Sequence, residues 1–390
     1  MKLLMLNHNV IGRGGYLRAF NYGRELSSRG HNVSLVTISE KRRFSFEIIK
    51  HDRLEIVKSP DLLWGRLRSG WDLWDTLARI AHILPKQFDL IHCVDSRPTV
   101  ILPGLALRHA KKIPLIIDWG DWWGRGGTIY ERKGNILDLF FAPIETYFEE
   151  AFQTRADGVI VLTKALERRA LSMGVKRNKL LKIDHGADTR RIRPIKRLSA
   201  RKKLGLDTRA VFIGYLGVIL KKDGELLIRS FNEVLRNYPK AKLLIIGNSN
   251  LSQNTILNEL NKIVFTDKIS YEKLNLYLAA CDVMVLPLHD NIANAGRWPS
   301  KVCDYMAAGC PIVTCPVGDM VDLFSDGNKG ILARDNPETF SKAIMRVIED
   351  EDLKVKLGKN ARNYAEKFLD WTVITDKLEK FYLQIIDCYN

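Results

Sequence analysis

Short apolar runs alternate along this chain with longer stretches in which apolar residues recur every three or four positions. Apolar runs bounded by turn residues are typical of buried strands, and the longer period is typical of amphipathic helices. In the first half, the strands predicted in this way are residues 2–7, 32–38, 54–58, 88–94, 114–118, 158–163 and 179–183. Helices are predicted at 16–29, where Gly30 ends the pattern, and at 99–109. This repeated order favours a parallel sheet covered by helices.

A second series of the same kind fills the other half of the chain. Its predicted strands are residues 210–215, 242–246, 282–287 and 311–314, and its predicted helices are 225–237, 271–280 and 300–309. The periodicity lapses between the two series at Arg193-Pro194-Ile195-Lys196. We therefore expect an α/β protein of two doubly wound, Rossmann-like domains, 1–192 and 193–370, facing a central cleft. Residues 371–390 predict a C-terminal helix that could cross back to the first domain.

The segment from Arg297 to Val313 holds the most concentrated candidate chemistry. Pro299 suits the start of a helix and Gly309 its end, so Lys301 and Asp304, three residues apart, share one face of the first turns. A helix N-terminus with Arg297 and Lys301 beside it favours an anion, and Asp304 can accept hydrogen bonds from paired sugar hydroxyls. The alternative is a surface Lys–Asp pair. The position between two predicted strands favours a site for a nucleotide diphosphate sugar.

Two glycine-rich turns connect a predicted strand to a helix, one in each half. The first contains Gly14 and Gly15, and the second runs from Gly214 through Gly217 to Gly224. Glycines let backbone N–H groups approach a phosphate closely. In the second turn, Lys221 or Lys222 could neutralise a diphosphate leaving group. Tight loops with solvated lysines are the alternative for both turns.

Composition indicates a globular protein with an affinity for anions. The 390 residues are 46% hydrophobic and 27% charged, and no apolar run approaches the length of a membrane span. The net charge is +16, and residues 1–190 contribute 31 basic and 21 acidic residues. Such a field favours phosphates, anionic lipid surfaces or nucleic acid as partners. A nucleic-acid-binding function has charge alone in its favour, since no recognised module is present, and we expect no nucleic-acid partner.

The cysteines and the first residues indicate in which cellular compartment the protein is expected. Six cysteines are scattered without CxxC spacing, which favours buried thiols in a reducing cytoplasm and suggests no metal site. The first residues read as a strand rather than as a signal peptide. We expect a cytoplasmic protein, with association to the inner face of the membrane as a further expectation.

Several motifs, taken together and in order, resemble one family. Gly14-Gly15 with Arg18, the run 156–163, His185-Gly-Ala-Asp188, residues 214–224, 280–287 and 299–313 are similar to the GT-B glycosyltransferases, specifically the retaining glycosyltransferase family 4. The likeness covers almost the whole chain. It implies a GT-B fold, a nucleotide diphosphate sugar as donor substrate, and neither a cofactor nor a required metal.

The resemblance also implies roles for individual residues. Donor contacts are expected from Gly14, Gly15, Gly217, Lys221, Lys222, His289, Arg297, Lys301 and Asp304. Lys222 is expected to meet the diphosphate and Asp304 the ribose hydroxyls. Two positions depart from the family pattern. The first of two glutamates expected at the Lys301 helix falls on Gly296, and a catalytic His expected before Asp121 falls on Gly120. Asp121 is then the nearest acidic candidate to act on the acceptor, and Asp121 and Lys222 are the catalytic candidates.

The first domain is expected to bind the acceptor. Arg18, Trp122 and Arg125 are the acceptor-side candidates, and six of the eight tryptophans lie in this half. From Trp64 to Leu84, apolar residues recur at helical spacing with arginines beside them. This helix could lie on an anionic membrane or pack in the core, and both interpretations remain open.

The resulting functional hypothesis is a retaining hexosyltransferase that moves a hexosyl group from a nucleotide diphosphate sugar to a hydroxyl. The expected acceptor is a glycolipid or surface-polysaccharide precursor. The alternative is a non-catalytic, nucleotide-sugar-binding partner subunit of a glycosyltransferase complex, motivated by Gly120 and Gly296.

Overall fold

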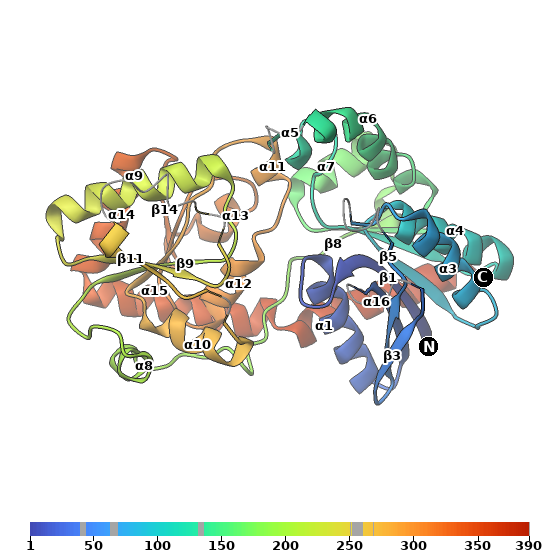
Figure 1. Ribbon diagram of the computed structural model, residues 1–390, viewed down its shortest axis with the longest axis horizontal. Helices are drawn as coiled ribbons and strands as arrows, with labels where there is room; N and C mark the ends of the chain where they lie inside the picture. The colour runs from blue at the N-terminus through green and yellow to red at the C-terminus, as the bar shows by residue number, and fades with distance from the viewer. Residues whose placement is uncertain are drawn as a thin grey trace. The chain divides into compact units, whose positions relative to one another are not determined.

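A computed structural model describes residues 1–39, 44–62, 69–131, 136–249, 251, 260–267 and 269–389. The chain forms two compact units (Figure 1). Unit 1 comprises the described residues of Met1–His185, Gly296–Trp298 and residues 371–389, and unit 2 comprises those of Gly186–Ala295 and Pro299–Asp370. The short segment Gly296–Trp298 belongs to unit 1 although unit 2 residues flank it, a feature that the sequence pattern did not predict.

Within its described residues, unit 1 is built on an eight-stranded sheet. The strands are β1 (Lys2–Val10), β2 (Asn32–Ile38), β3 (Glu47–His51), β4 (Leu54–Ser59), β5 (Leu90–Val94), β6 (Leu115–Trp119), β7 (Gly158–Val161) and β8 (Leu180–Lys182). Their order is β3-β4-β2-β1-β5-β6-β7-β8, with β3 antiparallel to β4 and the other pairs parallel. Strand β3 was absent from the sequence prediction because its exposed positions lack an apolar run.

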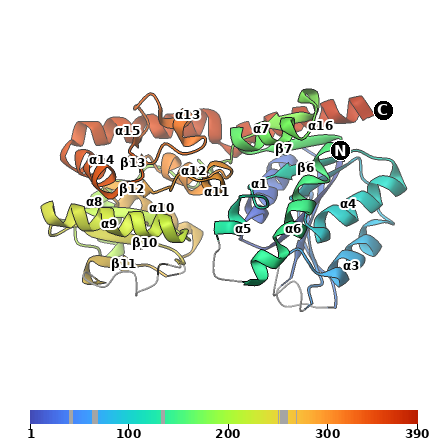
Figure 2. The ribbon, with the colours of Figure 1, turned by 90° about the horizontal axis from the view of Figure 1, so that it is seen from above.

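Helices cover both faces of this sheet, as Figure 2 shows. They are α1 (Gly15–Ser28), α3 (Leu73–Ile83), α4 (Pro98–Lys111), α5 (Thr128–Glu131), α6 (Ile136–Glu150), α7 (Lys164–Ser172) and α16 (Trp371–Tyr389). Successive residues of β1 alternate between the faces: Leu3 and Met5 pack with α1 and α16, whereas Leu4 and Leu6 pack with α3, α4 and α7. A parallel sheet buried on both sides explains why its strands read as continuous apolar runs.

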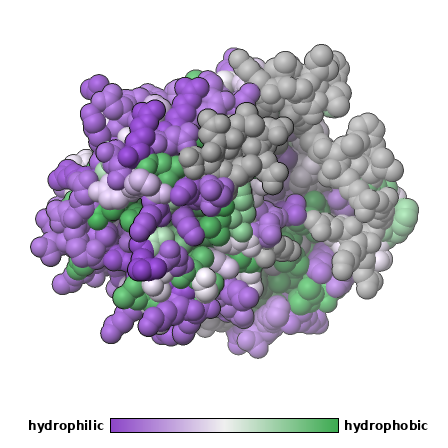
Figure 3. All heavy atoms as spheres, turned by 60° about the vertical axis from the view of Figure 1, so that its left-hand side comes forward, coloured by the Kyte–Doolittle hydropathy of each residue, from purple (hydrophilic) through white to green (hydrophobic). Residues whose placement is uncertain are grey.

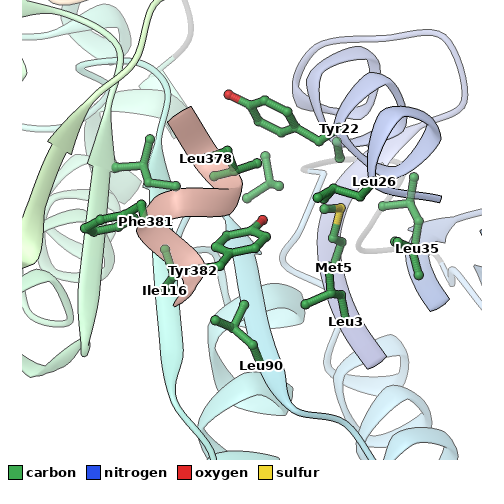
Figure 4. Close-up of a cluster of buried hydrophobic side chains, with 14 of the residues drawn as sticks. Leu3, Met5, Tyr22, Leu26, Leu35, Leu90, Ile116, Leu378, Phe381 and Tyr382 are labelled. Carbon is green, nitrogen blue, oxygen red and sulfur yellow. The ribbon is translucent and has the colours of Figure 1, made fainter. Parts of the chain in front are cut away.

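The C-terminal helix α16 is an integral part of the unit 1 core. Figure 4 shows Leu378, Phe381 and Tyr382 of α16 gathered with Tyr22 and Leu26 of α1 over the sheet. The Tyr382 hydroxyl also hydrogen-bonds Nδ1 of the buried His92. Residues from the far end of the sequence therefore complete one face of the N-terminal sheet.

Unit 2 has a six-stranded parallel sheet within its described residues. The strands are β9 (Phe212–Leu216), β10 (Lys242–Ile246), β11 (Ile263–Phe265), β12 (Val283–Leu286), β13 (Ile312–Thr314) and β14 (Ile331–Leu332), in the order β11-β10-β9-β12-β13-β14. The helices are α8 (Arg197–Leu204), α9 (Lys221–Asn237), α10 (Tyr271–Ala280), α11 (Ile292–Ala295), α12 (Ser300–Ala307), α13 (Met320–Phe324), α14 (Pro337–Glu349) and α15 (Glu351–Tyr364). Helix α9 packs beside α14, and α8 packs against α10. Both units are doubly wound, Rossmann-like α/β folds, as the sequence predicts.

The aromatic helix predicted from Trp64 to Leu84 is wrong at residues 69–72, which are not helical. Residues 63–68, which include Trp64 and Arg66, lie outside the described residues, and α3 begins only at Leu73. Gly70 has a φ of +84°, which a helix does not contain, and the Asp72 side chain caps α3 by accepting the Asp75 N–H. Trp71 therefore precedes the helix, and its indole Nε1 donates to Glu145 of α6 at 2.9 Å.

Where residues are coloured on the face drawn in Figure 3, most are hydrophilic, with small hydrophobic areas between them. None of the helices in the described part of the chain is long and apolar enough to cross a membrane.

Helix α16 supplies a direct test of this core. Leu378 is fully buried, whereas Leu383 on the same helix is 47% exposed. Leu378→Ala should lower the free energy of unfolding by about 2–5 kcal/mol, because it removes buried surface and leaves a cavity. Leu383→Ala, the matched control, should change it by no more than about 0.5 kcal/mol. Urea unfolding followed by far-UV circular dichroism measures both, and equal effects would contradict the assignment of α16 to the core.

Candidate functional site

Each sheet contains a point at which the strand order reverses. In unit 1, the chain builds outward from β1 to β2 on one side and later continues with β5 on the other. In unit 2, β9 lies in the same way between β10 and β12. Ligands of doubly wound folds bind outside the carboxyl ends of the strands at such a point. The loops that follow β1, β5, β9 and β12 are therefore the places to look for functional side chains.

In unit 2, Lys301 connects α12 to the loop after β9. Its ammonium Nζ donates to the Tyr215 hydroxyl at 2.6 Å and to the Val218 carbonyl at 3.0 Å, and it lies 4.1 Å from the centroid of the Tyr215 ring. A second link runs from the Leu216 N–H to the Tyr305 hydroxyl of α12 at 2.9 Å. The first turn of α12 is thus held against the end of β9, with a cation between them.

The glycine turn after β9 leads directly into α9. Gly217 has a φ of +79°, which requires glycine, and its N–H donates to the Ile246 carbonyl at 2.8 Å. No side chain caps the N-terminus of α9 at Leu220, and Lys221 and Lys222 are exposed on its first turn. The N-terminal end of this helix therefore combines backbone N–H groups with two accessible ammonium groups. The geometry does not favour one of these lysines over the other.

Asp223, which was not among the predicted site residues, organises the loop after β12. Its buried Oδ1 accepts the His289 N–H at 2.7 Å and the Asn294 side-chain N–H at 3.0 Å. The His289 ring is half exposed and its Nδ1 lies 3.0 Å from Oδ2 of Asp335. His289 is therefore held at the carboxyl end of β12, beside the start of α9, by two carboxylates. An acidic residue in a first helical turn was the available signal for Asp223.

Asp304 lies three residues after Lys301 and is partly buried. Burial raises the pKa of its carboxyl to about 7, and the nearby Asp188 carboxylate adds to this effect. Asp188 itself is buried and accepts the Arg191 N–H at 3.2 Å. A carboxyl group in this state gains stability from hydrogen-bond donors that favour its ionised form, such as the hydroxyls of a ligand.

In unit 1, the glycine turn after β1 is closely packed. Gly14 has a φ of +49°, and a Cβ at Gly15 would lie 2.9 Å from Cγ1 of Val94. The Gly15 N–H donates to Oδ1 of Asn9 at 2.9 Å, so a side chain of the protein already accepts this donor. Both glycines are thus required by the local backbone, whatever ligand they contact.

Gly14 and Gly15 line a cavity of about 400 Å³ at the switch point of unit 1. Its wall also includes His8 at the end of β1, Asp95–Arg97 after β5, the loop after β6, and one side of α6. Of the acceptor-side and catalytic candidates, Asp121 lines the cavity. His8, Asp95, Arg97 and Glu145 were not predicted, although a polar residue directly after an apolar strand is a signal that His8 and Asp95 both carry.

Arg18 does not face this cavity. Its guanidinium is buried in unit 1, where Nε donates to Oδ2 of Asp118 at 2.7 Å and Nη1 donates to the Asp184 carbonyl at 3.2 Å. Burial alone would raise the pKa of Asp118, but Arg18 and His92 hold it below its ordinary value. Arg18 thus forms a structural ion pair, because α1 turns this residue toward the sheet, and the acceptor contact expected from it stays a prediction.

Asp121 and Arg297 lie side by side. A short antiparallel bridge pairs them, and the Trp122 N–H donates to the Gly296 carbonyl at 3.1 Å. Arg297 thus belongs to unit 1 rather than to the Lys301 helix that it precedes in the sequence.

The remaining two acceptor-side candidates lie in the loop after β6. The Trp122 indole donates to the Arg125 carbonyl at 2.9 Å, and Arg125 is exposed and pairs with Glu150 at 3.2 Å. Trp123, rather than Trp122, lines the cavity. Asp121 thus lies beside Arg297 and shares the cavity wall with Trp123. Trp122 and Arg125 are linked within the loop, and the acceptor contacts expected from them stay predictions.

In the described ranges, no group of three or more His, Cys, Asp and Glu side chains is arranged to hold a metal ion.

Comparison with known families gives two consecutive matches. The profile of "Glycosyltransferase Family 4" matches residues 14–191, and that of "Glycosyl transferases group 1" matches residues 196–364. An uncharacterized glycosyltransferase of Methanocaldococcus jannaschii is 25% identical over 288 residues, which cover 72% of this chain and 70% of that protein. A D-inositol 3-phosphate glycosyltransferase of Corynebacterium jeikeium is 24% identical over 48% of this chain and 46% of its own length. In most of the curated relatives compared, the match spans about half of their length.

Solved structures share the whole fold. Sucrose-phosphate synthase from Thermosynechococcus elongatus has a TM-score of 0.77 at 18% identity, covering all of both chains. Anabaena HepE in complex with UDP-glucose has a TM-score of 0.70 at 16% identity, covering 97% of this chain and 98% of that one. WaaG, a glycosyltransferase involved in lipopolysaccharide biosynthesis, has a TM-score of 0.73 at 16% identity, covering 97% and 99%. At these identities the likeness concerns the fold.

The raised pKa of Asp304 predicts a pH-dependent stability. Below about pH 4 the carboxyl is protonated in both the folded and the unfolded chain, and it imposes no penalty. As the pH rises from about 4 to about 7, the unfolded chain loses this proton before the folded chain does, because the folded pKa of about 7 lies above the ordinary value of 3.8, so the folded state loses stability over this range. Asp304→Asn should therefore unfold at a higher temperature than the wild type at about pH 8, with the difference vanishing toward about pH 4.

Thermal unfolding across this pH range measures the effect. Asp188→Asn is the companion variant. It removes the neighbouring negative charge, so the pKa of Asp304 should fall and the loss of stability should occur at lower pH than in the wild type. A difference between Asp304→Asn and wild type that does not vary with pH would contradict the assignment.

Proposed function

Since this chain is a GT-B glycosyltransferase that resembles glycosyltransferase family 4, we propose that it is a retaining hexosyltransferase using a nucleotide diphosphate sugar. The proposed reaction moves the hexosyl group to a hydroxyl of the acceptor. Retention of configuration is inferred from the family likeness. The proposal includes a glycolipid or surface-polysaccharide precursor as the acceptor, and activity without a required metal.

The observation that carries the proposal is the position of Lys301 in unit 2. Its ammonium is held at the carboxyl end of β9 by Tyr215 and the Val218 carbonyl, at the point where the strand order reverses. Lys221 and Lys222 add two exposed cations at the start of α9. A diphosphate requires this kind of charge, both to bind and to leave when the bond to the sugar breaks.

The other proposed donor contacts follow from the same switch point. Asp304 is proposed to accept hydrogen bonds from the ribose hydroxyls, which favour the ionised form of a carboxyl whose pKa is raised to about 7. His289, held by Asp223 and Asp335, is proposed to contact the donor sugar. Gly217 lets the backbone turn closely enough to approach a phosphate. Solved GT-B neighbours of this fold contain UDP and UDP-glucose, which supports a nucleotide sugar as the substrate.

On the acceptor side, we propose that Asp121 acts on the acceptor hydroxyl. Its position in the wall of the unit 1 cavity supports this role, and Arg297 lies beside it. In a retaining transfer the departing diphosphate can take the proton of that hydroxyl, so that Asp121 needs only to orient it. Gly14 and Gly15 line the same cavity and are retained as proposed donor contacts.

A peripheral contact with an anionic membrane surface at the inner face of the membrane is part of the proposal. Leu73, Trp74 and Leu77 of α3 are 67%, 46% and 55% exposed, and the chain carries a net charge of +16. Exposed apolar side chains on a basic protein favour an anionic lipid surface. This contact would suit a lipid-linked acceptor.

Two lysine substitutions test the donor site. Lys222→Ala and Lys301→Ala should each weaken binding of the preferred nucleotide sugar about tenfold or more, because each removes a charge-assisted contact to a phosphate. Lys202→Ala is the matched control, since Lys202 is exposed on α8 of the same unit. Calorimetric titration with UDP-, GDP- and ADP-sugars measures the affinities. Equal affinities for wild type and both variants would contradict the donor assignment.

The same titrations distinguish the alternative function, a non-catalytic nucleotide-sugar-binding partner subunit. That alternative is motivated by glycine at positions 120 and 296. The enzyme should release sugar slowly from its bound donor and transfer it when a suitable acceptor is added. Tight donor binding without hydrolysis or transfer would favour the partner subunit.

A further inference from the structure

The walls of the unit 1 cavity carry more negative than positive charge. Among the described residues that line it, Asp95, Asp121, Glu145 and Glu149 are acidic and Arg97 is the permanent cation. Burial lowers the pKa of His8, and the charge of Arg97 lowers it further, so His8 stays neutral near neutral pH. These side chains favour a neutral acceptor over a phosphorylated one, whereas the donor contacts proposed for Gly14 and Gly15 come from the backbone.

Arg97 is moreover engaged by the protein. Its Nη1 donates to the Ser69 carbonyl at 2.6 Å, its Nη2 lies 3.7 Å from Oε1 of Glu145, and its guanidinium lies 4.8 Å from the centroid of the Trp123 ring. The positive charge is therefore opposed by a neighbouring carboxylate and held against an aromatic ring, which weakens its attraction for a further anion.

The carboxylates differ in what they can still accept. Glu149 is buried and accepts hydrogen bonds from the Trp119 indole at 2.9 Å, the Trp123 N–H at 2.8 Å and the Gly124 N–H at 2.5 Å. Asp95 differs because its side chain is 34% exposed. Its Oδ2 lies 2.9 Å from Nε2 of His8, and its Oδ1 has no hydrogen-bond partner among the described residues. Oδ1 of Asp95 is thus available to a ligand in the cavity.

His8 fixes the orientation of this carboxylate. A carboxylate only accepts hydrogen bonds, so Nε2 of the neutral His8 carries the proton and donates it to Oδ2. Nδ1 then faces the Ser69 hydroxyl at 3.2 Å. The backbone of Asp95 is held as well, with a φ of +69° and its N–H donating to the Asp118 carbonyl at 2.9 Å. Backbone conformations of this kind are uncommon for residues with a side chain and often occur at ligand sites.

Gly120 leaves open the space in front of Oδ1. A Cβ at position 120 would lie 4.0 Å from Oδ1 of Asp95 and within 4 Å of no other non-neighbouring atom. This is the position where the family pattern expects a histidine. The glycine therefore replaces a side chain by room for a ligand next to a carboxylate oxygen.

We propose that the unit 1 cavity binds the acceptor as a neutral sugar, with Oδ1 of Asp95 accepting a hydrogen bond from a sugar hydroxyl and His8 positioning the carboxylate. Hydroxyls are the donors that an open carboxylate selects, and the cavity of about 400 Å³ also offers the aromatic side chains of Trp123 and Phe148. This inference rests on the proposed function, because it names the acceptor class of that reaction.

The experiment measures the binding of small sugar probes to the full chain by saturation-transfer NMR. The neutral probes are the methyl glycosides of glucose, galactose and mannose, and the anionic probes are glucose 6-phosphate and inositol 1-phosphate. At least one neutral glycoside should bind more tightly than either phosphate. Asp95→Asn should weaken that binding about tenfold or more, since it replaces a charged acceptor by a neutral one. Asp387→Asn, an exposed carboxylate of α16, is the matched control and should have no effect.

Two further variants separate ligand contact from folding. Gly120→Ala should unfold at the wild-type temperature, because its Cβ meets no close neighbour, yet weaken glycoside binding by placing a methyl group before Oδ1. His8→Gln keeps an N–H donor and should retain more binding than His8→Leu. All four cavity variants should bind the nucleotide sugar in unit 2 as the wild type does.

The outcomes are distinct from those that test the proposed function. Failure of the wild type to bind or hydrolyse any nucleotide sugar would reject the proposed function. Normal donor binding, combined with tighter binding of a phosphorylated probe, would overturn the inference alone. So would unchanged glycoside binding in Asp95→Asn, or binding of none of the neutral glycosides to the wild type.

Discussion

The buried carboxylate of Asp118 connects four elements of unit 1. Arg18 of α1 donates to it, His92 of β5 lies 3.5 Å away, and the Tyr382 hydroxyl of α16 hydrogen-bonds the other side of the same imidazole. A buried charge without such partners would be strongly destabilising, so the helices on this face must meet the sheet in one register. The Asp118 carbonyl also accepts the Asp95 N–H, and in this way the constraint extends to the cavity wall. The core interaction and the candidate acceptor site thus share one residue.

Much of the fold could be predicted from the sequence because both sheets are buried on both faces. Parallel strands such as β2 and β10 were predicted at their observed bounds, since their apolar runs have no other explanation. Strand β3 could not be predicted, because its pairing with β4 is set by the hairpin rather than by burial. The start of α3 depends on Gly70 and on the Asp72 cap, which together outweigh the helical spacing of the preceding tryptophans.

A site residue could be predicted from the sequence when its position depends only on the strand and helix next to it in the chain. Lys301, Asp304 and the turn at Gly217 lie close to one switch point because they follow neighbouring parallel strands, β12 and β9. Arg18 could not be placed in this way. The first turn of the helix that follows a glycine-rich loop can face a ligand, but the residues after it, including Arg18, face the sheet. His8 of β1 and Asp95, which directly follows β5, are 87 residues apart in the sequence, and the β1–β5 pairing brings them together. Likewise, the role of Asp223 depends on the loop after β12, which contains His289.

The division of the chain has a consequence for how the molecule can be cut. The backbone passes between the units after His185, on both sides of Gly296–Trp298, and after Asp370. A single nick by a protease therefore cannot release either unit as one continuous piece. A contiguous fragment ending at His185 would also lack α16, whose side chains complete the hydrophobic cluster over β1, β5 and β6. An engineer could rejoin residue 185 to residue 371 by a new peptide connection, but the resulting fragment would still lack Gly296–Trp298 of the first unit.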